Sequence, residues 1–103
     1  MAPPNGQGDL YRRVNEMSAI GDARMKRLRW RARRGTRELD ALLGGWLDAH
    51  AASMDEARFA AFDALLDQQD PELWDWLMGH ADPPRADWRA IVAEIRRHAG
   101  LAQ

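Results

Sequence analysis

The residues best suited to do chemistry lie in one short segment, Arg33-Arg34-Gly35-Thr36-Arg37-Glu38-Leu39-Asp40, in which a glycine separates a basic run from an acidic one. Arginine and carboxylate side chains in this arrangement can form charge-assisted hydrogen bonds with a partner. The segment holds no metal-ligand set and no glycine-rich phosphate loop. His50, His80 and His98 stand without i, i+4 partners, and the chain has no cysteine. The sequence therefore predicts a binding protein and not an enzyme.

Charge is segregated along the chain, although the net charge is only -1. Residues 24 to 37 contain eight basic residues and no acidic one, and residues 38 to 82 contain eleven acidic residues against the single basic Arg58. Such a dipolar surface steers the approach of a charged partner.

The basic segment 24 to 37 also supports an alternative function, a small nucleic-acid-binding or antitoxin-type regulatory module. In that interpretation the cations neutralise phosphates and Trp30 stacks on a base. A sequence pI of about 6.3 and the acidic remainder of the chain make nucleic acid the less favoured partner.

Length and composition predict one domain with one modest core, since the chain has 103 residues. No apolar run approaches the roughly 18 residues of a membrane helix, and the N-terminus lacks the apolar centre of a secretory signal. We therefore expect a cytoplasmic protein without membrane insertion. Residues 1 to 21 include Pro3-Pro4-Asn5-Gly6 and have little to bury, so we expect a flexible tail there and a helical domain over residues 22 to 103.

Apolar periodicity predicts an all-α fold, a small bundle of five helices. The expected helices cover about residues 22 to 34 and 36 to 52, begin again at residues 53 and 70, and end with residues 86 to 99. The expected N-terminal caps are Asp22, a capping box of Ser53 with Glu56, and Asp70 ahead of Pro71. Gly35 is the expected break between the first two helices, and Gly100 the stop after the last.

Apolar stripes predict which side chains are buried. Met25, Leu28 and Ala32 form a narrow stripe on the first helix, and the clearest stripe, on the second, consists of Leu39, Leu42, Leu43, Trp46 and Leu47. Apolar residues of the fourth helix span about 200° of its circumference at 100° per residue, so we expect this helix to be central. Trp46, Trp74 and Trp76 are accordingly predicted to pack in the core.

These residues together resemble the succinate dehydrogenase flavinylation factor family, the SdhE or YgfY proteins, some of which carry the name antitoxin CptB. The resemblance covers roughly residues 24 to 98. It rests on Trp30, the segment from Arg33 to Asp40, the Leu65-Leu66 pair, and Asp70-Pro71-x-Leu73-Trp74-x-Trp76-Leu77, in that order.

The resemblance implies a five-helix bundle of the YgfY type that acts as an assembly factor. Members bind the flavoprotein subunit of succinate dehydrogenase or of fumarate reductase and promote covalent attachment of FAD to a histidine of that subunit. By family match, Arg34, Gly35 and Glu38 are contact residues. The expected partner-binding surface as a whole consists of Trp30, Arg33, Arg34, Gly35, Arg37, Glu38 and Asp40.

Structural interpretations of the same residues remain open at this point. Gly35 can serve as a simple turn and as the N-cap of a capping box with Glu38, beside arginines that complement a helix dipole. Trp30 can be an interface anchor or can pack under the Gly35 turn. On the functional interpretation, Arg34 and Glu38 lie at an exposed helix junction, and the free protein is a monomer that binds no FAD, metal or other cofactor of its own.

Overall fold

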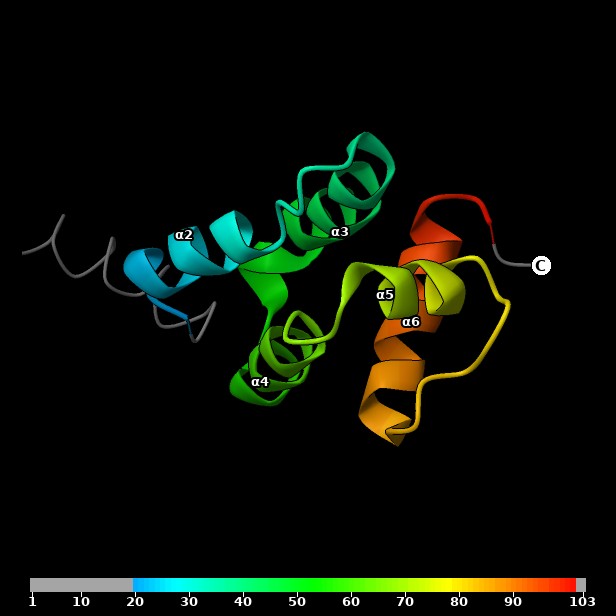
Figure 1. The fold of residues 1–103 in the computed structure, drawn as a ribbon. Coiled ribbons are helices and arrows are strands. Elements are labelled where there is room, and N and C mark those ends of the chain that lie inside the picture. The colour runs from blue at the N-terminus through cyan, green and yellow to red at the C-terminus, as the bar shows by residue number, and fades with distance from the viewer. Residues whose placement is uncertain (1–19, 102–103) are drawn as a thin grey trace, which may run out of the picture.

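The computed structural model describes residues 20–101, which contain five α-helices joined by short turns and no strand (Figure 1). The helices are α2 (Asp22–Arg31), α3 (Arg37–His50), α4 (Glu56–Leu65), α5 (Asp70–Leu77) and α6 (Ala86–His98), with a 3-10 turn, η1 (Ala51–Ser53), after α3. The predicted all-α fold of five helices is confirmed. Of the predicted tail, residues 1–19 lie outside the described residues, and Ile20 is buried in the core.

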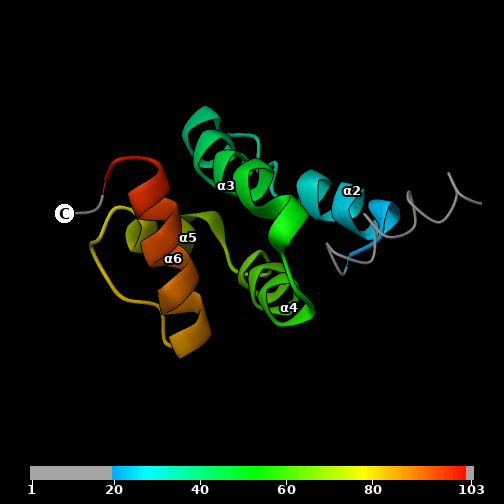
Figure 2. The same cartoon turned by 180° about the vertical axis from the view of Figure 1, so that it is seen from behind.

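Helix α6 is the centre of the packing. It contacts α3, α4 and α5, and it buries one face formed by Trp88, Ile91, Val92 and Ile95. Figures 1 and 2 show α5 stacked against α6 at one end of the body. The predicted stop at Gly100 is also confirmed, because this residue has a φ of 77° and follows the C-cap Ala99.

Helix α5 is not the central helix, so that prediction is wrong. Its buried residues are Leu73, Trp76 and Leu77, which fall within an arc of about 100° at 100° per residue. Trp74 lies outside that arc and remains 36% exposed. The predicted core position of Trp74 is therefore wrong, whereas those of Trp76 and of the fully buried Trp46 are confirmed.

Helix α2 lies at the opposite end of the body, beside α3 and α4 (Figures 1 and 2). It buries the predicted stripe of Met25, Leu28 and Ala32. Ion pairs fasten it to its neighbours: Arg29 to Asp48 of α3, Arg24 to Glu56 of α4, and Arg31 to both Asp63 and Asp67 at the end of α4. Helix α2 is thus held in place by a narrow apolar stripe and by charged side chains on both sides of that stripe.

Helix caps differ from the predicted ones at α2 and α4. The N-cap of α2 is Gly21, and Asp22 is the first helical residue. At α4 the Oδ1 atom of Asp55 caps the helix by accepting a hydrogen bond from the backbone N of Arg58 over 2.8 Å. The predicted box fails because Ser53 sits in the 3-10 turn, where its hydroxyl donates to the His50 carbonyl.

The cap of α5 is shifted by one residue. Gln69 is the N-cap and forms a capping box with Glu72, whose Oε1 accepts from the Gln69 backbone N over 3.2 Å. Asp70 is instead the first helical residue. Its carboxylate is engaged by an arginine from the α2–α3 turn.

Candidate functional site

The turn between α2 and α3 carries the predicted motif and has a defined backbone. Gly35 adopts a φ of 92°, a conformation that favours glycine. Thr36 is the N-cap of α3, so the alternative in which Gly35 caps that helix is wrong. The backbone N of Arg34 donates to Oδ1 of Asp40 over 2.6 Å. Asp40 therefore holds the turn from the first turn of α3.

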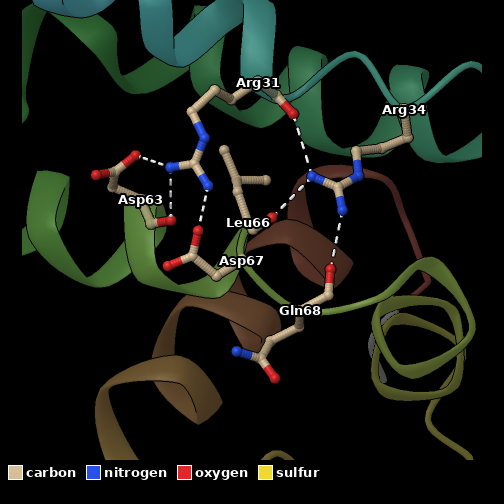
Figure 3. Close-up of polar contacts among 6 residues, drawn as sticks. All are labelled: Arg31, Arg34, Asp63, Leu66, Asp67 and Gln68. Carbon is tan, nitrogen blue, oxygen red and sulfur yellow. Dashed lines mark hydrogen bonds and ion pairs between the residues drawn. The ribbon is translucent and has the colours of Figure 1, made fainter.

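The side chain of Arg34 points into the molecule and is only 17% exposed. Its Nε donates to Oδ1 of Asp70 over 2.8 Å. Its Nη1 donates to the carbonyl of Leu66 over 2.8 Å and to that of Arg31 over 3.2 Å, and its Nη2 donates to the carbonyl of Gln68 over 2.8 Å. Figure 3 shows the three carbonyl contacts. We call Arg34 and these four partners the Arg34 junction.

The Arg34 junction has a clear electrostatic basis. Arg31 is the last residue of α2 and Leu66 is the C-cap of α4, so a cation meets the negative ends of two helix dipoles. Asp70 opens α5, where a carboxylate is favourable. The guanidinium uses four of its five N–H donors, and no other side chain offers such a planar fork. The expectation that Arg34 lies at an exposed junction is therefore wrong, because it ties three helices together.

Arg31 makes a second set of bonds next to the Arg34 junction. Its guanidinium donates to the carboxylate and the carbonyl of Asp63 and to the carboxylate of Asp67 (Figure 3). With Arg24, Arg29 and Arg34, four of the eight cations in residues 24 to 37 are engaged in ion pairs within the described part of the chain. These cations are not free to neutralise phosphates, which removes half of the charge on which the nucleic-acid alternative depends.

Several motif residues do face solvent. Trp30 is 71% exposed, so it does not pack under the Gly35 turn, and the guanidinium carbon of Arg33 lies 5.9 Å from its ring centroid. Arg33, Arg37 and Glu38 are exposed and form no recorded ion pair with any residue between positions 20 and 101. The motif face, as we call it, consists of Trp30, Arg33, Gly35, Arg37 and Glu38.

A groove that the sequence reasoning missed borders this face. It has a volume of about 420 Å³ and a mostly apolar wall, and it is formed by the starts of α3 and α5. Its lining residues are Thr36, Glu38, Leu39, Asp70, Pro71 and Trp74, and we call it the Glu38 groove. The signal in the sequence was the apolar arc of residues 73–78, which is wider than the single face that a short helix can bury.

Two carboxyl groups with lowered pKa values lie outside the motif. A hydrogen bond from Arg24 lowers the pKa of the Glu56 carboxyl, and one from Arg85 likewise lowers the pKa of Asp87. Residues 20–101 include no helix that is long and apolar enough to cross a membrane. The same part of the chain has no cluster of three histidine or acidic side chains arranged to hold a metal ion.

Comparison with known proteins connects this geometry to a family. The family model described as "Flavinator of succinate dehydrogenase" matches residues 26–99. The chain is 39% identical over 72 residues to the FAD assembly factor SdhE of Coxiella burnetii, which covers 70% of this chain and 88% of the relative. It is 42% identical over 74 residues to the SdhE of Xylella fastidiosa strain 9a5c (72% and 76% covered) and 44% identical over 70 residues to that of Legionella pneumophila strain Paris (68% and 87% covered).

No solved structure was found to match the chain. The family match runs from the middle of α2 to the end of α6 and includes the Arg34 junction, the motif face and the Glu38 groove. The chain therefore belongs to the succinate dehydrogenase flavinator family.

Proposed function

We propose that this protein is an assembly factor that binds the flavoprotein subunit of succinate dehydrogenase, or of fumarate reductase, and promotes covalent attachment of FAD to that subunit. Family membership supports this function, as do relatives of about 40% identity that carry the name FAD assembly factor. The structural observation that carries it is the motif face. Arg37 and Glu38 are exposed there and form no ion pair with any other residue in the range 20–101, and the hydrogen bond from Arg34 N to Asp40 Oδ1 fixes the backbone of the turn.

The motif face is suited to a close protein contact. Gly35 presents no side chain, and apart from its two chain neighbours no residue among positions 20–101 lies within 4 Å of the position that a Cβ would take there. Arg37 and Glu38 follow on the first turn of α3 and are both exposed. A partner backbone can therefore approach Gly35 while these two side chains form charge-assisted hydrogen bonds with it.

The seven predicted contact residues divide into two groups on this proposal. Arg34 and Asp40 act as positioning residues, because their hydrogen bonds set the conformation of the turn. The five residues of the motif face make the contacts. A surface that is already ordered loses less conformational entropy on binding, so the Arg34 junction favours affinity without touching the partner.

The mechanism is selective binding. A factor that prefers the flavoprotein conformation in which flavin and acceptor histidine are correctly apposed raises the population of that conformation. The bond-forming chemistry remains that of the flavoprotein, so this protein is not an enzyme and has no FAD site of its own. It acts as a cytoplasmic protein that is a monomer when free.

Complementation with a single-charge variant tests this function. Cells that lack the factor receive the parent, Glu38→Ala or Asp22→Ala, and covalent flavin fluorescence is measured in the denatured flavoprotein band. Asp22 is the matched control, an exposed carboxylate in the first turn of α2. We expect Glu38→Ala to lower the covalent flavin signal and to weaken binding of the purified subunit by about 30-fold, the loss of one interface hot spot. Full flavinylation in cells without any factor would contradict the function.

A further inference from the structure

Trp74 is exposed in an unusual setting, on the wall of a concave and mostly apolar surface. It is 36% exposed and lines the Glu38 groove opposite residues of α3. Leu39, which is only 3% exposed, contributes buried apolar surface to the same groove. Concave apolar surface that receives a side chain is where binding free energy concentrates in protein interfaces.

The shape of this groove is held by the fold. Pro71 has a restricted backbone and stands at the start of α5, which the Gln69–Glu72 capping box stabilises. The ion pair of Arg34 with Asp70 connects the α5 side of the groove to the turn that precedes α3. The groove is thus present before any partner arrives, and its volume of about 420 Å³ suits one or two side chains better than a whole helix.

Charge around the groove defines what can enter it. Asp70 is paired with Arg34, so its negative charge is already compensated. Glu38 lines the groove, is exposed, and forms no recorded ion pair within the described range. A ligand segment that places an apolar side chain against Trp74 and a cation beside Glu38 complements both features.

We propose that the Glu38 groove is a docking site for an apolar side chain of the flavoprotein subunit, with an adjacent arginine or lysine of that subunit paired with Glu38. The proposal rests on the proposed function and extends the contact surface from the α2–α3 turn onto α5. The groove is continuous with the motif face, because Glu38 belongs to both. Trp74 then contributes to recognition of the partner rather than to the core.

Binding of the purified flavoprotein subunit by Trp74 variants tests the groove. We expect Trp74→Ala to weaken binding by about tenfold or more, and Trp74→Phe to bind close to the parent. Leu101→Ala is the matched control, because Leu101 is 39% exposed and follows α6, outside the groove. It should bind as the parent does. A melting curve for each variant confirms that it is folded at the temperature of the binding measurement.

Salt dependence tests the expected cation. Glu38→Gln keeps the shape of the side chain and removes its charge, so the slope of log Kd against log salt should fall relative to the parent. Trp74→Ala should leave that slope unchanged, since it removes apolar contact only. If the slope is unchanged in Glu38→Gln, the proposed pairing of Glu38 with an arginine or lysine of the subunit is wrong.

The fluorine resonance of 5-fluorotryptophan at position 74, assigned by its loss in Trp74→Phe, gives a measurement on the parent protein. We expect this resonance to shift when the subunit binds. Parent binding with no shift, together with parent-like affinity of Trp74→Ala, overturns the groove and leaves the proposed function standing. Failure of the parent itself to bind the flavoprotein subunit overturns the proposed function instead.

Discussion

Arg34 and Asp70 are 36 residues apart in sequence and are joined by a hydrogen bond of 2.8 Å between Nε and Oδ1. The bond connects the turn before α3 to the first residue of α5. Three further donors of Arg34 bind carbonyls at the ends of α2 and α4 and in the α4–α5 turn. A residue in the middle of the predicted partner-binding motif thus connects three helices inside the fold.

The first prediction concerns the stability contributed by Arg34. Arg34→Ala leaves three part-buried carbonyls and the Asp70 carboxylate without their donor, so we expect the free energy of unfolding to fall by about 2 to 3 kcal/mol. Urea denaturation monitored by helical circular dichroism measures this. Arg34→Lys should recover only part of the loss, because an ammonium group cannot reach four acceptors in one plane.

Arg33→Ala is the control for this prediction. Arg33 is exposed and has no recorded ion pair inside residues 20–101, so its replacement should change the stability by no more than about 0.5 kcal/mol. Equal stability of Arg33→Ala and Arg34→Ala would show that the Arg34 junction does not support the fold.

The second prediction compares two glycines. Gly35→Ala places a side chain at a φ of 92°, so we expect the free energy of unfolding to fall by about 1 to 2 kcal/mol, although no residue among positions 20–101 other than its chain neighbours crowds the new Cβ. Gly44 lies inside α3 with the same open space. Gly44→Ala should therefore stabilise the protein by about 0.5 to 1 kcal/mol through helix propensity. Thermal and urea denaturation of both variants measure whether their changes in stability have opposite signs.

The third prediction separates two tryptophans of α5. Trp76 is 8% exposed and its ring centroid lies 5.9 Å from that of Trp88. We expect Trp76→Ala to cost about 3 to 5 kcal/mol, the range for aromatic truncation in a core. Trp74→Ala should cost clearly less, because that side chain keeps more of its surface in water. Similar losses at the two positions in the same denaturation assay would place Trp74 in the core.

The fourth prediction concerns acid. The hydrogen bond from Arg24 lowers the pKa of Glu56 in the folded protein, below an unfolded value of about 4.3. The stabilisation is therefore fully present above the unfolded pKa and is lost as pH falls through the lower folded value. We expect Glu56→Gln to speed amide hydrogen exchange in α2 at pH 7. As pH falls below the unfolded value, the difference between the variant and the parent should shrink, and a difference independent of pH would rule out this ion pair as the cause.

The spacing of apolar residues predicted the helices and most of the core, because a helical repeat of about 3.6 residues can be recognised from residues that are close in sequence. The stripes of α2 and α3 and the stop at Gly100 were recognised in this way. The caps were less predictable. Ser53 and Asp70 are residue types that favour an N-cap, yet one donates to the His50 carbonyl and the other accepts from Arg34. In both cases the side chain binds a partner other than the backbone amide that it was predicted to cap.

The sequence by itself determined the all-α class and the family, since both depend on residue types at short spacing. Only the tertiary structure decided the orientation of Arg34 and Trp74. An arginine between two helices is usually solvated. Arg34 is held inside the fold because the α4–α5 turn and the start of α5 bring two carbonyls and a carboxylate to it, beside the carbonyl of Arg31 at the end of α2. A tryptophan on a short helix is usually buried, and Trp74 remains exposed because α5 packs on α6 through one narrow face.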